Sequence, residues 1–198
     1  MQTQEAEWLA KAQKGDDEAF SRLVEAYQGP VYNVCYRMLG NAGDAEDAAQ
    51  EAFLRAYKAI KRYDPNRKFS TWLLTIASNY CIDQHRRKRL PSFSIEDTPT
   101  QDVPDTSEVG MDFKMIANER QAEVQMLLET LSPKDRAAIV MLYWYDYSYE
   151  EIAESLSLTV SAVKSRLHRA RRELAGTWME REPVAIPAER TQHGSSTI

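Results

Sequence analysis

The stretch from Ser148 to Leu174 constrains this chain most, because it has the pattern of a helix-turn-helix. Ser148 can cap a first helix, since Glu151 follows it at the spacing of a capping box. Thr159 can cap a second helix, in which apolar residues recur every three or four positions. This periodicity predicts one buried stripe, made of Val163, Leu167, Ala170 and Leu174.

The opposite face of this second helix carries short polar and basic side chains. Lys and Arg in such a position meet phosphates and guanine edges when a helix enters the major groove. A solvated basic helix in a bundle would show the same charges, but the short turn between two helices favours DNA. The candidate DNA-facing residues are Thr159, Ser161, Lys164, Ser165, Arg166, His168, Arg169 and Arg172.

Composition bounds the class of protein. The chain has 198 residues and a formal net charge of −5, but its acid is concentrated in residues 91–118, and local field decides where phosphate binds. The longest apolar run is far shorter than the roughly 20 residues of a membrane span, and the first residues lack the apolar core of a signal peptide. The two cysteines are expected to be buried thiols, and the three histidines form no metal-binding pattern.

Helical periodicity and turn signals divide the chain into two small helical domains, which predicts an all-α fold. Residues 1–90 read as successive helices, and residues 119–178 form a second domain that contains the helix-turn-helix. Residues 91–118 are rich in Pro, Ser, Thr and acid, so we expect a flexible acidic linker there. Residues 179–198 show no periodicity and are expected to be a disordered tail.

The predicted helix from Asp44 to about Lys61 has one apolar face and one acidic stripe. Its alanines and Phe53 are expected to pack inward. A stripe of this kind is often only a solvated helix face, but acid beside an exposed leucine also suits a protein-docking surface. The stripe consists of Asp47, Gln50, Glu51 and Leu54, the last three lying three, four and seven residues beyond the first.

A second candidate site leads into the predicted helix from Ser70 to Arg89. It interleaves basic and aromatic residues, which suits single-stranded nucleic acid because cations follow the backbone and rings stack on unpaired bases. The rings at the start of this helix are equally compatible with a place in the core. The segment contains Arg62, Tyr63, Arg67, Lys68, Phe69 and Trp72.

Three ordered motifs together resemble the extracytoplasmic-function (ECF) group of bacterial sigma factors, over about residues 5–178. They are DAEDAAQEAF, FSTWLLTIASNYCIDQHRR, and LSPKDRAAIVMLYWYDYSYEEIAESL with the following VKSRLHRARREL. The resemblance implies a cytoplasmic initiation factor without enzyme activity or cofactor. Its first domain would bind the clamp helices of core RNA polymerase and the melted minus-10 element, and its second domain would bind the minus-35 element.

The resemblance also implies roles for individual residues. The polymerase-binding motif would contain Asp47, Gln50, Glu51 and Phe53, with Phe53 supporting the surface rather than touching the polymerase. The melting segment would contain Tyr63, Arg67, Phe69 and Trp72. The helix facing minus-10 DNA would contain Asn79, Asp83, Arg86 and Arg87. The minus-35 reading helix would contain Lys164, Ser165, Arg166, His168 and Arg169.

Two departures from the family pattern affect the second domain. Family members often have glycine where this chain has Asp146 and Ser157, so slight changes in those two turns are expected. Ser161 and Ala162 replace bulkier or glycine-containing pairs, which leaves the preferred promoter sequence open.

Two other functions are compatible with parts of this sequence. In the first, a conventional helix-turn-helix regulator would use residues 1–90 for ligand binding or dimerisation, but the aromatic-basic segment and the acidic stripe argue against it. In the second, an adaptor without DNA binding would not need the cationic helix. The expected partners are core RNA polymerase and promoter DNA, and an anti-sigma protein is left open. Because a flexible linker lets small domains pack together, we expect a compact free form that hides the aromatic-basic segment and the cationic helix.

Overall fold

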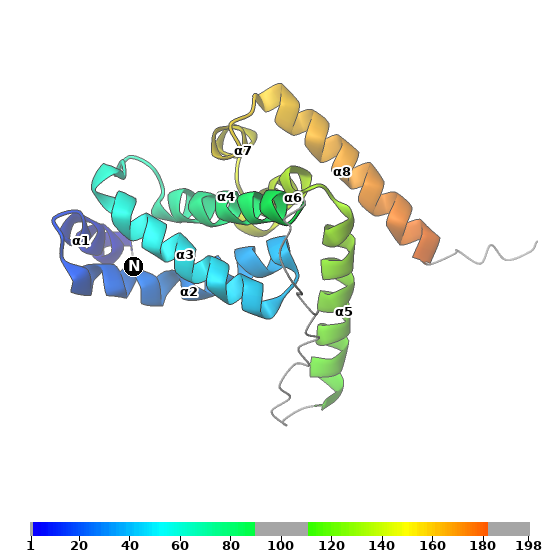
Figure 1. Ribbon diagram of the computed structural model, residues 1–198, viewed down its shortest axis with the longest axis horizontal. Coiled ribbons are helices and arrows are strands. Elements are labelled where there is room, and N and C mark those ends of the chain that lie inside the picture. The colour runs from blue at the N-terminus through cyan, green and yellow to red at the C-terminus, as the bar shows by residue number, and fades with distance from the viewer. Residues whose placement is uncertain (1, 90–110, 182–198) are drawn as a thin grey trace, which may run out of the picture.

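The computed structural model describes residues 2–89 and 111–181, and every regular element in these ranges is a helix, which confirms the all-α prediction (Figure 1). Residues 90–110, within the predicted linker, and residues 182–198, within the predicted tail, lie outside this description. The elements are α1 (Gln2–Ala12), α2 (Asp17–Leu39), α3 (Ala42–Ala59), the 3-10 helix η1 (Ile60–Arg62), α4 (Phe69–Arg89), α5 (Met111–Thr130), α6 (Pro133–Tyr145), α7 (Tyr149–Ser155) and α8 (Val160–Arg181).

Local caps set the helix boundaries of the first domain. Asp16 caps α2 by accepting a hydrogen bond from the amide of Ala19 at 3.0 Å. Gly40 ends α2 in the left-handed conformation, with φ of 78°. Asn41 then caps α3, since its side chain accepts from the Asp44 amide at 2.9 Å. The predicted start of this helix at Asp44 was therefore wrong, because the capping oxygen belongs to the asparagine three residues earlier.

Helices α2, α3 and α4 pack side by side, with α1 against one end of α2 (Figure 1). The alanine face of α3 is buried, as predicted, and small side chains let this helix lie close to its neighbours. The buried alanines are Ala45, Ala48, Ala49, Ala52 and Ala56.

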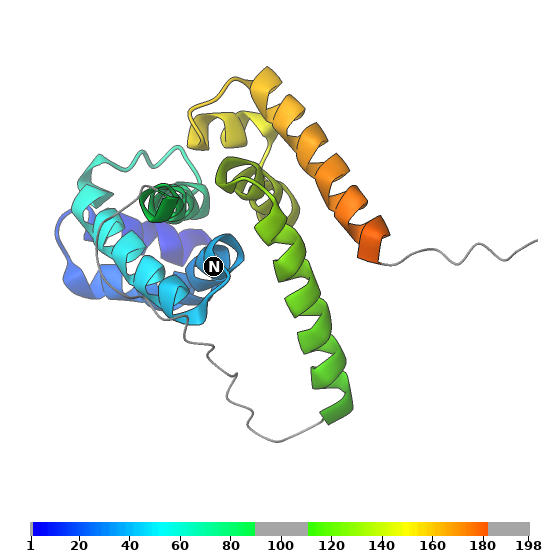
Figure 2. The same ribbon diagram turned by 45° about the vertical axis from the view of Figure 1, so that its right-hand side comes forward.

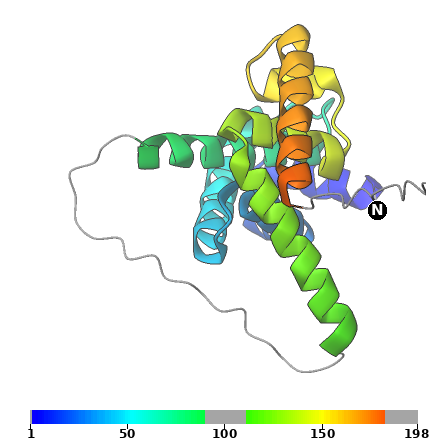
Figure 3. The same cartoon turned by 90° about the vertical axis from the view of Figure 1, so that its right-hand side faces the viewer.

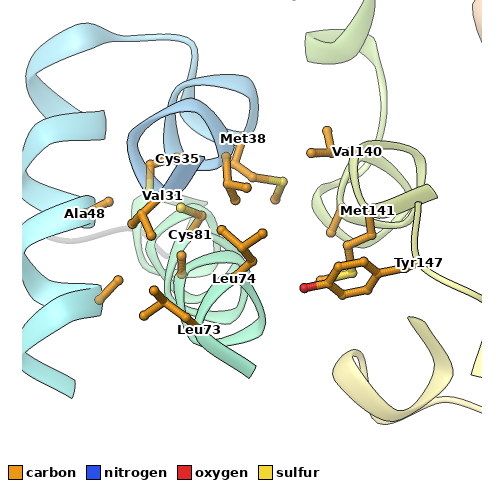
Figure 4. Packing of buried hydrophobic residues seen from close by; sticks show 14 of the residues in the cluster. Val31, Cys35, Met38, Ala48, Leu73, Leu74, Cys81, Val140, Met141 and Tyr147 are labelled. Atoms are coloured by element: carbon orange, nitrogen blue, oxygen red, sulfur yellow. The ribbon is translucent and has the colours of Figure 1, made fainter. Parts of the chain in front are cut away.

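The two cysteines lie in this core on α2 and α4 (Figure 4). Cys35 and Cys81 are both fully buried and both free, which confirms the expectation of buried thiols. A hydrogen bond with Cys35, and next to it burial, raise the pKa of the Cys81 thiol. The thiolate is the reactive form of cysteine, so this core disfavours thiol chemistry.

Treatment of the native protein with iodoacetamide at neutral pH is expected to leave both cysteines unmodified. Burial excludes the reagent, and the raised pKa of Cys81 keeps its thiol protonated. Mass spectrometry should find both thiols alkylated only after unfolding in urea. Equal alkylation of native and unfolded protein would contradict this packing.

The second domain is built around α6, with α7 and α8 forming the helix-turn-helix. Ser132 caps α6 and Pro133 occupies its first turn. The predicted capping box at the start of α7 is present, since the Ser148 and Glu151 side chains each accept from the other's main-chain amide. Thr159 accepts from the Ala162 amide at 3.2 Å and so caps α8.

Asp146 and Ser157 both adopt left-handed backbone, each with φ of 53°. They therefore take the conformation that glycine favours, although their side chains make it less favourable than it is for glycine. The turns before α7 and α8 are thus formed with left-handed residues in spite of the absence of glycine.

The two domains lie in contact, with α6 against α2 and α4, and α7 against α4 (Figures 2 and 3). Buried apolar side chains run from one domain into the other, with Met38 and Leu74 facing Met141 (Figure 4). Four side chains of the second domain donate hydrogen bonds to main-chain carbonyls of the first. These are Arg136 to Met38, Gln125 to Arg37 at 3.4 Å, Tyr145 to Pro30 at 3.0 Å, and Tyr147 to Thr71 at 2.9 Å.

Candidate polymerase and nucleic-acid interfaces

The acidic stripe of α3 lies on the surface. Asp47 and Gln50 are exposed, and 54% of Leu54 is accessible to solvent. Glu51 is half-buried and pairs with Arg55, with 2.7 Å between Oε1 and Nε. The stripe therefore presents the exposed apolar side chain of Leu54 beside carboxylate and amide groups.

A groove of about 450 Å³ between α2 and α3 adjoins this stripe. Phe53 lines it and is half-buried against the core, a position that suits a supporting role. Gly29 leaves open space in the wall, since a Cβ atom placed there would meet no atom within 4 Å. Sequence reasoning missed the α2 side of this groove, because its residues follow the same helical period as the core. That side is formed by Val24, Gln28, Gly29 and Tyr32.

The aromatic residues between η1 and α4 form a cluster in the core. Tyr63 and Phe69 are only 4% and 2% exposed, so their rings are not available to stack on bases in this conformation. Tyr63 contacts Phe69 and Trp72 with ring centroids 5.5 and 5.1 Å apart, and Tyr27 contacts Phe69 at 5.3 Å. The core alternative thus fits these two rings, whereas Trp72 is half-buried. The cations of the same segment, Arg62, Arg67 and Lys68, are exposed.

The minus-10 candidates on α4 continue this surface. Asn79 is exposed, as are Arg86 and Arg87 near the end of the helix. Asp83 is half-buried and pairs with Arg86, with 3.3 Å between Oδ1 and Nη2. This side of α4 therefore combines an amide group with charges of both signs.

Helix α7 of the second domain covers part of this surface. The Asn79 amide donates to the Ser155 carbonyl at 3.1 Å, and the Thr75 and Ser155 hydroxyls lie 2.7 Å apart. The Arg67 guanidinium lies 2.6 Å from the Glu154 carboxylate. Three groups that could meet a DNA strand are thus bonded to the second domain. Sequence reasoning missed Thr75, because a threonine at that position carries no signal of its own.

The front of α8 is not covered. The back of the helix is buried at Val163, Leu167 and Ala170, as the periodicity predicts. The expectation that the compact form hides the cationic helix was therefore wrong, because the first domain contacts α7 at the other side of the turn. The exposed residues on the front are Thr159, Ser161, Lys164, Ser165, His168, Arg169 and Arg172.

Arg166 differs from the other candidates on α8. Its side chain is only 26% exposed and forms an ion pair with Asp135 of α6, 14% exposed, at 2.8 Å. Lys164 is exposed, with its ammonium 5.9 Å from the centre of the Tyr149 ring. Arg166 thus joins α8 to α6, whereas Lys164 is free to meet a ligand from solvent.

Comparison with known proteins agrees with this arrangement. Residues 23–90 match the family model of sigma-70 region 2, and residues 121–174 match that of sigma-70 region 4. The chain is 40% identical over 177 residues to the ECF RNA polymerase sigma factor SigW of Bacillus subtilis, covering 84% of this chain and 92% of that one. The chain belongs to the ECF sigma factor family. It is also 34% identical to the ECF sigma-E factor of Escherichia coli K12, covering 82% and 88% of the two chains.

A solved structure shows the same fold over most of the chain. The structure of CnrH in complex with the cytosolic domain of CnrY matches this sigma factor with a TM-score of 0.66 at 25% identity, covering 90% of this chain and 99% of that one. In this sigma factor, region 2 contains most of the α2–α4 bundle and region 4 contains the helix-turn-helix. The region 2 match occupies the segment that a ligand or dimerisation domain would need, so the conventional-regulator alternative is not favoured.

The function follows from the family. This sigma factor binds core RNA polymerase and directs it to promoters, and sigma factors are non-enzymatic initiation factors. Among residues 2–89 and 111–181, no helix is both long and apolar enough to cross a membrane. In the same ranges, no three His, Cys, Asp or Glu side chains gather closely enough to hold a metal ion.

Proposed function

We propose that the acidic stripe and the adjoining α2–α3 groove form the main contact with core RNA polymerase. Two observations support this: the apolar side chain of Leu54 is 54% exposed, and an apolar hollow lies beside it, lined by Phe53. A helix with basic and apolar side chains would complement both features. In this proposal Asp47, Gln50, Glu51 and Leu54 contact the polymerase, and Phe53 supports them from below.

The melted minus-10 strand is proposed to bind along the start and outer side of α4. Exposed cations would hold the phosphates, and the half-buried Trp72 is the ring best placed to stack on a base. Tyr63 and Phe69, which are buried, would hold the segment in shape rather than touch the strand. The proposed contacts are Arg62, Arg67, Lys68, Trp72, Asn79, Asp83, Arg86 and Arg87.

The minus-35 element is proposed to bind the front of α8. The observation that carries this proposal is the division of the helix into a buried apolar back and an exposed basic front, directly after a capped turn. Thr159, Ser161, Ser165, His168, Arg169 and Arg172 would lie with Lys164 in or beside the major groove. Arg166 would act mainly through α6.

Replacement of Lys164 and Arg166 by alanine should therefore give different results. Lys164→Ala is expected to weaken minus-35 duplex binding by roughly 1 kcal/mol and to leave the unfolding free energy unchanged. Arg166→Ala is expected to lower the unfolding free energy by about 1–2 kcal/mol, because it leaves the half-buried Asp135 carboxylate without its cation, although the Ser132 hydroxyl still donates to it. Urea unfolding and a duplex-binding assay at one fixed salt concentration measure both effects. An Arg166→Ala variant of full stability that has lost minus-35 binding would reverse the two assignments.

The limits of the two domains and the cellular location of the protein are also part of this proposal. We assign residues 1–90 to polymerase binding and minus-10 melting, residues 119–178 to minus-35 binding, and the acidic segment between them to the connection. α5 begins at Met111, so the connection is helical before residue 119. The location would be cytoplasmic, since core polymerase and the chromosome are there. An anti-sigma protein is a further proposed partner, because the sigma factor RpoE of Bartonella quintana, whose fold this chain shares with a TM-score of 0.59, was solved in complex with the anti-sigma factor NepR.

Transcription in vitro tests the whole proposal. Core polymerase with this sigma factor should start transcripts at a defined subset of genomic fragments, and core polymerase alone should not. If the chain co-purifies with core polymerase but starts no transcript on any fragment, the promoter-reading assignments fail.

A further inference from the structure

Gln13 lies in the turn after α1, far in sequence from the minus-10 surface but in contact with it. Its side-chain amide donates to the carbonyl of Tyr63 at 2.8 Å and to the carbonyl of Ile60 at 3.3 Å. These acceptors are 50 and 47 residues away in the chain. We propose that Gln13 is a positioning residue for promoter melting, which holds the segment of residues 63–68 in the shape that captures the minus-10 strand.

The acceptors are the points where this segment needs support. Tyr63 directly follows the end of the 3-10 helix η1, so its carbonyl has no partner within that helix. The Ile60 carbonyl already accepts from the Tyr63 main-chain amide at 3.1 Å, and Gln13 adds a second donor to it. One amide nitrogen carries two hydrogens, so a single glutamine can satisfy both carbonyls. A glutamate of the same shape has no hydrogen to donate when it is ionised.

Apart from the ion pair of Arg67 with Glu154 of the second domain, the remaining bonds of the segment are local. The Arg67 amide donates to the Asp64 carbonyl at 3.1 Å, and the Asn66 amide donates to the Asp64 carboxylate at 2.9 Å. The Tyr63 hydroxyl donates to the Arg67 carbonyl. These local bonds shape the turn but do not fix its start to the rest of the first domain. Gln13 makes that connection, together with the packing of the buried Tyr63 ring.

Gln13 is itself held in place. The main-chain amide of Gln13 donates to the Leu9 carbonyl at 3.0 Å, and the neighbouring Ala12 is buried. Gly15 then turns the chain into α2 with φ of 93°, in the left-handed region where a side chain is strained. Gln13 also precedes residue 23, where the match to the region 2 family model begins, so this residue lies outside the match.

The support from Gln13 should affect promoter melting. This inference rests on the proposed role of Arg62, Arg67 and Lys68 in holding the melted strand. On duplex DNA, capture of the strand competes with re-pairing, so a segment already in shape opens the promoter faster. On a promoter with a pre-melted minus-10 region, this competition is absent. A loosened segment should therefore be defective only on the duplex.

The test uses the full chain with core polymerase. Gln13→Met keeps the length of the side chain but removes the donors, and Gln13→Glu keeps the shape but removes them too. Both are expected to slow open-complex formation on a duplex promoter about fivefold, the effect of one or two ordinary hydrogen bonds. Gln13→Lys restores donors that can reach helix-end carbonyls and is expected to recover most of the rate. Gln4→Met, at an exposed position on α1, is the matched control and should behave as wild type.

The outcomes separate this inference from the proposed function. Support requires a duplex-specific defect, normal rates on the pre-melted promoter, unchanged core binding and recovery by Gln13→Lys. An equal loss on both templates, or no loss on the duplex, overturns the role of Gln13. The double variant Arg62→Ala with Lys68→Ala is run in parallel. If that variant melts the duplex normally, the proposed function of the segment fails; if it is defective while Gln13→Met is not, only the inference fails.

Discussion

Asp47→Arg combined with Glu51→Arg is expected to weaken binding to core RNA polymerase roughly 100-fold, since like charges placed opposite each other in an interface cost several kcal/mol. Both positions belong to the stripe beside Leu54, which is 54% exposed. The fold should persist, because Asp47 is exposed and Glu51 makes only a surface pair with Arg55, a contact worth less than about 1 kcal/mol. Pull-down with core polymerase measures binding, and circular dichroism checks the helix content.

A matched control reverses two acids elsewhere in the same domain. Glu18→Arg with Glu25→Arg makes the same change in charge on α2, where both acids pair with Arg22 on an exposed side. This control should bind core polymerase nearly as wild type does. If the two double variants bind equally weakly, the loss reflects overall charge. If the stripe variant binds normally, the polymerase assignment is wrong.

Separation of the domains is expected to increase the affinity of the free sigma factor for single-stranded minus-10 DNA about tenfold. In the closed form, the groups that Arg67 and Asn79 would offer to the strand are bonded to Glu154 and Ser155 of α7. Glu154→Arg places a cation against Arg67, and Tyr147→Phe removes the hydrogen bond to the Thr71 carbonyl. Together these changes should disfavour the closed form by about 1–2 kcal/mol.

Added positive charge by itself attracts DNA, so the measurement needs a control of equal charge. Glu150→Arg with Tyr147→Phe changes the same helix at an exposed residue that makes no pair with Arg67. Fluorescence anisotropy with a short minus-10 oligonucleotide should separate the two variants at one fixed salt concentration. Binding of a minus-35 duplex should be the same in both, because the front of α8 is already exposed. Equal oligonucleotide affinity in the two variants would show that α7 does not compete with the strand.

The helices could be predicted from sequence because their signals are local. Asp16, Ser132 and Ser148 are caps, and each lies directly before the helix that it begins. The apolar periods likewise identified the buried stripe of α8 and the alanine face of α3. Such signals depend on neighbours within one or two turns, so they do not require knowledge of the tertiary fold.

The contacts of the candidate sites could not be predicted in the same way. Tyr63 and Phe69 suit base stacking and core packing equally well, and only their burial decides between the two. Arg166 has the same sequence signal as Lys164, but Asp135, 31 residues earlier, occupies it. Gln13 carries no signal at all, because its acceptors are main-chain carbonyls that every sequence has.

Four of the bonds between the domains constrain the sequences of the two domains to different degrees. In these four bonds, Arg136, Gln125, Tyr145 and Tyr147 of the second domain supply the donors, and main-chain carbonyls of the first domain accept them. A carbonyl persists whatever residue occupies the position, so region 2 can change its side chains there without losing an acceptor. Each of the four donors, in contrast, is lost by a single substitution. A chimera that joins this region 4 to the region 2 of a relative should therefore keep these four bonds, whereas the reverse chimera should keep them only if the relative has the donors.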